Sequence, residues 1–77
     1  MDKTIREHDT VALLHDLPDT PLIAGDVGVI VYVYDNGHAY EVEFPNPGGH
    51  PRFLVETVEV ANVLKLQPRS RLKSDVA

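Results

Sequence analysis

The chain of 77 residues contains no cysteine and no tryptophan, and it has no long apolar run. Without cysteine it can form neither disulfide bonds nor thiolate zinc sites, which leaves the redox compartment undecided. No apolar stretch approaches the roughly 20 residues that a membrane-spanning helix needs, and the N-terminus lacks a signal-peptide pattern. We therefore expect a soluble, cytoplasmic protein with no membrane association.

Basic residues are scarce in the central part of the chain. Between Glu7 and Leu64 there are ten Asp or Glu residues and one basic residue, Arg52, a net charge of −9. The other six basic residues lie near the two ends: Lys3, Arg6, Lys65, Arg69, Arg71 and Lys73. Since an acidic domain repels phosphate backbones, nucleic-acid binding by this core is not expected. A basic protein, or the chain's own basic tail, is a better match.

A β-hairpin is predicted between residues 25 and 44. The pair Asn36-Gly37 favours a two-residue type I′ turn, because both central residues of that turn need positive φ. This turn predicts three cross-strand pairs on one apolar face, which should point at the core: Val33–Tyr40, Val31–Val42 and Val29–Phe44. The opposite, mixed face then carries Ile30, Tyr32, Tyr34, Ala39, Glu41 and Glu43.

The remaining segments predict short strands at 9–14, 52–60 and 63–66. The first is followed by a loop with Pro18 and Pro21, which Leu22 and Ile23 should hold against the core. We expect Gly25 to adopt an unusual backbone angle and Gly28 to mark a bend or bulge. Imperfect alternation in 52–60 predicts another bulge, near residues 56–57, and residues 60–62 suit a single 3₁₀ turn.

This order of elements predicts an all-β fold, a small SH3-like barrel of about five strands with a 3₁₀ turn before the last strand. The barrel should occupy residues 9–67, between a flexible N-terminus (1–8) and a basic, flexible, disordered tail (68–77). An open meander completed by dimerisation is the alternative.

Three groups of residues carry a resemblance to a known family. Asp16-Leu17-Pro18, Gly25-Asp26-Val27-Gly28 and the strand 40–44 (Tyr-Glu-Val-Glu-Phe) together resemble small bacterial proteins, frequent in cyanobacteria, that share a domain of unknown function. The resemblance extends from about residue 8 to 66 and implies an SH3-like fold, with no catalytic residues to carry over. The Gly-Asp-x-Gly-x-Val pattern is also similar to KOW-type modules of translation and transcription proteins, but those are usually basic.

The sequence offers little support for catalysis, a metal or a cofactor. The four histidines, His8, His15, His38 and His50, fall in loops or at strand ends without helical metal-site spacing, although His15 and Asp16 with another loop histidine could form a site. Glu41 and Glu43 share a strand face that lacks the asymmetric burial of an acid/base pair. Residues 25–28 precede a strand and lack the lysine of a phosphate-binding loop. We therefore predict a protein that is not an enzyme.

The mixed face suggests recognition of another protein. Tyrosines give a large contact area and carboxylates select a basic partner, although tyrosines also commonly do no more than cover a sheet surface. The predicted site comprises Ile30, Tyr32, Tyr34, Glu41, Glu43, Pro18 and Leu22. The leading hypothesis is a non-enzymatic interaction module, the small acidic partner of a basic protein, as an antitoxin or immunity protein is.

Two other functions are compatible with the sequence. One is a KOW-like nucleic-acid or ribosome-associated module that acts through Arg52, Lys65, Arg69, Arg71 and Lys73. The other is a structural homodimer formed through an uncovered strand edge.

Overall fold

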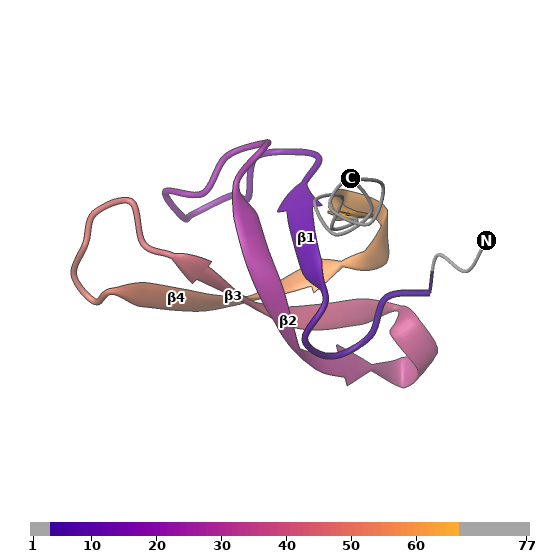
Figure 1. Ribbon diagram of the computed structural model, residues 1–77. Coiled ribbons are helices and arrows are strands. Elements are labelled where there is room, and N and C mark those ends of the chain that lie inside the picture. Colours follow the sequence, from indigo (N-terminus) through magenta and orange to yellow (C-terminus); the bar gives the residue numbers. More distant parts are fainter. Residues whose placement is uncertain (1–3, 67–77) are drawn as a thin grey trace, which may run out of the picture.

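A computed structural model describes residues 4–66 of the chain. Its elements are β1 (Thr10–Leu13), β2 (Val27–Tyr34), η1 (Asp35–Gly37), β3 (Ala39–Pro45), β4 (Phe53–Glu59), η2 (Val60–Asn62) and β5 (Val63–Lys65), where η marks a 3₁₀ turn (Figure 1). The strands form one antiparallel sheet in the order β4-β3-β2-β1-β5. Within residues 4–66, no helix is long and apolar enough to cross a membrane.

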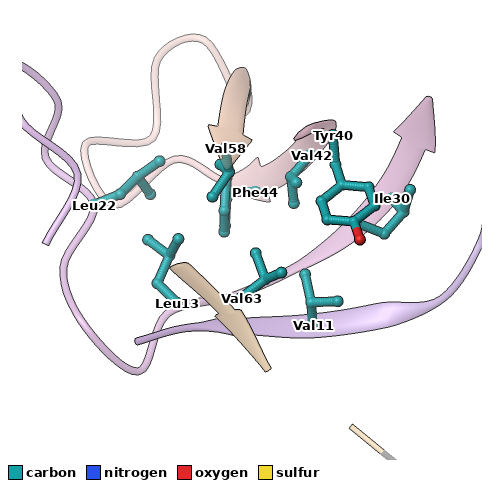
Figure 2. Packing of buried hydrophobic residues seen from close by; sticks show 9 residues of the cluster. All are labelled: Val11, Leu13, Leu22, Ile30, Tyr40, Val42, Phe44, Val58 and Val63. Carbon is teal, nitrogen blue, oxygen red and sulfur yellow. The ribbon is translucent and has the colours of Figure 1, made fainter. Parts of the chain in front are cut away.

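The predicted all-β fold and its order of elements are confirmed, including the 3₁₀ turn before the last strand. The predicted barrel, however, is not closed. In the described part of the chain, β4 and β5 are the two edges of the sheet and do not pair with each other. The sheet instead curls around its core, and side chains from β1 and β5 face those from β3 and β4 (Figure 2).

The core consists of apolar side chains from all five strands and from one loop. Its buried members are Val11, Leu13, Leu22, Ile30, Tyr40, Val42, Phe44, Val58 and Val63. In β3 the strict alternation of Tyr40, Val42 and Phe44 with polar residues directs one side of the strand inward, as the sequence predicts.

A β-bulge in β2 changes which side chains of this strand face the core. Near the turn, the predicted pairs Tyr34–Ala39, Val33–Tyr40 and Tyr32–Glu41 are present. The register then shifts between Ile30 and Tyr32, so Ile30 pairs with Val42 and Val29 pairs with Glu43. An extra residue reverses the alternation beyond it. Ile30 is therefore fully buried, whereas Val29 and Val31 are 39% and 42% exposed, and the predicted faces of these three residues were wrong.

The turn between β2 and β3 is also longer than predicted. Four residues separate the last pair, Tyr34–Ala39, and the His38 N–H donates to the Tyr34 carbonyl at 3.2 Å. Asp35, Asn36 and Gly37 all have positive φ. The Asn-Gly preference for positive φ thus predicted the position of the turn correctly, but the turn has four residues between the paired strands and is not a two-residue type I′ turn.

Gly28 lies where β2 packs closely on side chains and backbone of β3. A Cβ atom at this position would lie 2.7 Å from Phe44 Cδ1, 2.7 Å from Val42 Cγ1 and 2.8 Å from the Glu43 carbonyl oxygen. The bulge that we expected near Gly28 is at Val31, and the role of this glycine is to allow close contact between the strands.

Strand β4 pairs with β3 without any shift in register from Phe53 to Glu59. The bulge predicted near residues 56–57 is therefore absent from the described strand. Leu54 and Val58 face inward, whereas Phe53 and Val55 are 47% and 54% exposed. The regular register places Leu54 and Val58 on the inward face and Phe53 and Val55 on the outward face, so both pairs are accommodated without a bulge.

The loop between β1 and β2 is held by its own hydrogen bonds. Gly25, with φ of +92°, has the backbone angle that the sequence predicts. Thr20 Oγ1 accepts from the Leu22 N–H at 3.0 Å and donates to the Leu17 carbonyl at 2.8 Å. Leu22 is buried as predicted, but its neighbour Ile23 is 56% exposed and does not hold the loop against the core.

The described part of the N-terminal segment lies along β2. Ile5 packs against the core, and the His8 N–H donates to the Ile30 carbonyl at 2.8 Å. Ile5 and His8, which lie in the N-terminal segment predicted to be flexible, therefore both contact the sheet. The predicted basic tail at 68–77 lies outside the described residues.

Candidate protein-interaction face

The side of β2, β3 and β4 that points away from the core carries an unusual number of exposed apolar side chains. Cross-strand pairs align two rows here, Val29–Glu43–Val55 and Tyr32–Glu41–Thr57. We call this surface the outer face and define it by Val27, Val29, Val31, Tyr32, Tyr34, Glu41, Glu43, Phe53, Val55 and Thr57. Seven of these ten residues are large, exposed apolar or aromatic side chains.

Glu41 is the centre of a hydrogen-bond network on the outer face. Its Oε2 accepts from the Tyr34 hydroxyl at 2.5 Å and from Thr57 Oγ1 at 2.7 Å. The hydrogen bond to Glu41, with smaller effects from desolvation and nearby charge, raises the pKa of Tyr34 above its ordinary value. The ring of Tyr32 packs edge-on against that of Tyr34, with centroids 4.8 Å apart. The network therefore fixes the orientation of one tyrosine.

Glu43 differs from Glu41 because its carboxylate has no hydrogen-bond or ion-pair partner among residues 4–66. It is partly buried between Val29 and Val55, its neighbours on the adjacent strands. A carboxylate flanked by apolar side chains is incompletely hydrated, so it gains more from a cationic group than a fully exposed carboxylate does. Glu43 is thus the position of the outer face best suited to attract positive charge.

The structure brings together four of the seven predicted site residues. Tyr32, Tyr34, Glu41 and Glu43 lie side by side on the outer face. Ile30 and Leu22 are core residues instead, because the bulge turns Ile30 inward and the loop packs Leu22 against the sheet. Pro18 is exposed in the loop between β1 and β2 and does not belong to the strands of the outer face.

Sequence reasoning missed several apolar members of the outer face, namely Val27, Val29, Val31, Phe53 and Val55. In β4 each face carries two apolar residues and one polar residue, Leu54, Glu56 and Val58 on one face and Phe53, Val55 and Thr57 on the other, so the alternation did not indicate which face is buried. In β2 both faces are apolar, so the pattern could not indicate which one is buried.

The basic residues considered for nucleic-acid binding do not form a cluster that the structure describes. Lys65 Nζ lies 3.4 Å from Asp9 Oδ2 and donates to the Thr4 carbonyl at 3.0 Å. Arg52 is exposed in the loop before β4. Arg69, Arg71 and Lys73 lie outside the described residues.

Residues 4–66 contain no group of three or more His, Asp or Glu side chains that could hold a metal ion. Open depressions that are lined wholly by described residues include the following two. One, of about 340 Å³, is lined by Asp26, Val27, Pro45, Asn46 and Pro47. The other, of about 410 Å³, is lined by Thr4, Ile5, Asn36, Gly37, Tyr40 and Val60. Neither places two carboxylates or a carboxylate and a histidine together, so neither has the composition of an acid/base site.

A family model matches residues 7–63, and the chain therefore belongs to the family called domain of unknown function (DUF4926). This span includes the Asp-Leu-Pro and Gly-Asp-x-Gly motifs and most of the sheet. The expected membership of a family of unknown function is confirmed. No curated protein and no solved structure matches the chain.

Proposed function

We propose that the chain is a non-enzymatic protein-interaction module whose outer face binds a basic protein, with the chain as the small acidic partner, as in antitoxin or immunity pairs. One observation carries the proposal: exposed valine, phenylalanine and tyrosine side chains surround the partly buried carboxylate of Glu43, which has no polar partner within residues 4–66. Contiguous exposed apolar surface is typical of interaction sites, and aromatic residues are enriched in interfaces. The carboxylates would select a partner of opposite charge.

Partner capture tests this proposal. A tagged wild-type chain is compared with a Tyr32→Ala, Glu43→Lys double variant of the outer face. Glu43 is chosen over Glu41 because replacing Glu41 would also remove the hydrogen bonds to Tyr34 and Thr57. The control is an Ile23→Ala, Glu7→Lys double variant, which changes the same kinds of exposed residue away from the outer face.

The expected result is a basic protein that the wild type and the control both recover and the face variant does not. Its recovery should fall as salt increases, since exposed charge pairs are screened. Equal recovery of the same proteins by all three chains would contradict the proposal. Sedimentation over a range of protein concentrations tests the structural homodimer. A wild-type dimer that forms as concentration rises, and that is absent in the face variant, would favour this alternative instead.

The KOW-like alternative has less support because the Lys65 ammonium group already forms an ion pair with Asp9 and a hydrogen bond with the Thr4 carbonyl. A gel-shift titration at low salt distinguishes the two functions. Binding of RNA or DNA that disappears when Arg69, Arg71 and Lys73 are replaced by Gln would favour the nucleic-acid function over protein interaction.

A further inference from the structure

We infer that the free edge of β4 accepts an extended basic segment of the partner as an additional antiparallel strand. The inference rests on the proposed function for the charge of the partner, and it adds the mode of binding. It depends on three properties of β4: backbone groups that no other strand of the described sheet pairs with, regular geometry, and the carboxylates beside the strand.

The direction of the β4 backbone groups follows from the two ends of its ladder with β3. The Val60 N–H donates to the His38 carbonyl at 3.0 Å, and the Asn46 N–H donates to the Arg52 carbonyl at 2.8 Å. Because hydrogen-bonded pairs alternate along an antiparallel ladder, the even-numbered residues of β4 bond to β3. The N–H and C=O groups of the odd-numbered residues therefore point to the free edge: Phe53, Val55, Thr57 and Glu59.

The β4 edge lacks the features that usually prevent strand addition. Proline, lysine, a bulge or a very short strand commonly protects a sheet edge. Strand β4 has seven residues, contains neither proline nor lysine, and keeps one register with β3 throughout. The opposite edge, β5, has only three residues. The longer and more regular β4 is therefore the better template for a partner strand.

The charges near this edge favour a basic partner over a second copy of the chain. Strands β3 and β4 carry Glu41, Glu43, Glu56 and Glu59 and no Lys or Arg. An antiparallel β4–β4 pair that used all four free residues of each copy would place Glu56 opposite Glu56, and like charges directly opposite are destabilising. A homodimer through this edge is thus disfavoured.

The register of the sheet indicates where the basic side chains of the partner would lie. A residue opposite Val55 would extend the row Val29–Glu43–Val55, so a long Lys or Arg side chain there could reach over Val55 towards the carboxylate of Glu43. A residue opposite Glu59 would face the Glu59 carboxylate directly. In antiparallel pairing, the partner residues opposite Val55 and Glu59 both form backbone hydrogen bonds with β4. The same two residues would therefore supply the positive charge and part of the hydrogen bonding.

A short peptide that alternates arginine with valine, blocked at both ends, tests the inference with the full chain. At a peptide concentration about ten times its Kd, amide hydrogen exchange at Phe53, Val55, Thr57 and Glu59 should slow about tenfold. The amides of Leu54, Glu56 and Val58, which already bond to β3, should change far less. The same peptide with glutamate in place of arginine should not bind.

Peptide methylation separates strand addition from attraction by charge alone, without altering the protein. N-methylation of the arginine residues should abolish binding, because these residues donate to β4, whereas N-methylation of the valine residues should not. In the protein, Glu43→Gln should weaken the arginine peptide about fivefold, and the control Asp19→Asn should leave its affinity unchanged.

The outcomes distinguish the inference from the proposed function. Failure of the arginine peptide to bind, equal binding of its glutamate counterpart, or binding that leaves the four amides unprotected would overturn strand addition. None of these would affect capture of a partner through Tyr32 and Glu43. Protection of the four amides in the free protein that increases with concentration would identify a second copy as the occupant and also overturn the inference.

Discussion

The bulge in β2 leads to a quantitative prediction about stability, because it places Ile30 in the core and the adjacent Val29 at the surface. Ile30 is fully buried, whereas Val29 is 39% exposed. Replacing a buried Ile by Ala removes its transfer free energy and leaves a cavity, a cost of about 3 kcal/mol within a range of roughly 2–5 kcal/mol. Val29→Ala loses only part of an exposed side chain and should cost less than about 1 kcal/mol.

Urea unfolding of Ile30→Ala and Val29→Ala, each compared with wild type, measures both costs. For a domain of this size, about 3 kcal/mol corresponds to a fall in Tm of roughly 12–24 °C. If Ile30→Ala does not fold, Ile30→Val provides a milder change of about 1 kcal/mol, to be compared with Val29→Ala. A larger loss from Val29→Ala than from Ile30→Ala would refute the bulge and restore the regular hairpin register.

Three further predictions concern packing and titration. Gly28→Ala should lower the free energy of unfolding by about 2 kcal/mol, because the new Cβ would meet side chains and a backbone carbonyl at 2.7–2.8 Å. In the same urea assay Gly48→Ala should leave the stability nearly unchanged, because its Cβ would lie 3.4 Å from the nearest atom. Leu22→Ala should destabilise by about 2–5 kcal/mol although it lies in a loop, and a change below about 1 kcal/mol would show that the loop is not part of the core. The raised pKa of Tyr34 means that the folded chain holds this proton more tightly than the unfolded chain, so its contribution to stability is complete below about pH 10 and declines as pH rises through the folded pKa. Ultraviolet titration should show this pKa falling in Glu41→Gln, and an unchanged pKa would rule out the hydrogen bond as its cause.

The sequence was sufficient for the parts of the fold in which polar and apolar residues alternate clearly. In β3, Glu41 and Glu43 alternate with Tyr40, Val42 and Phe44, so the inward and outward sides were predicted correctly. The prolines and the Asn-Gly pair marked the loops for the same reason, since their backbone preferences do not depend on the rest of the fold.

Strand β2 could not be resolved in the same way. Val27, Val29, Val31 and Val33 alternate with Gly28, Ile30, Tyr32 and Tyr34, so either set could form a core face. A bulge reverses the faces without leaving a polar residue on the wrong side, and only the packing of Ile30 against its neighbours determines which set is buried. Consequently Tyr32 and Tyr34 lie on the outer face as predicted, whereas Ile30 lies in the core.

The candidate site also depends on tertiary structure that local pattern does not contain. Leu22 was placed at the surface site, although we also expected it to pack against the core, and the two roles are incompatible for one buried side chain. The sequence did not indicate that Phe53 and Val55 are exposed, because large apolar side chains are usually buried. Their exposure beside Glu43 is what now defines the outer face.

The most direct test of the proposed function is a map of the chain's ¹⁵N chemical shifts with a captured basic partner bound. Our account predicts that the largest changes fall on the outer face, at Val29, Tyr32, Glu43 and Val55, and that the loop between β1 and β2 changes little. Changes confined to that loop, or to the segment around Arg52 and Lys65, would contradict the outer face as the binding surface.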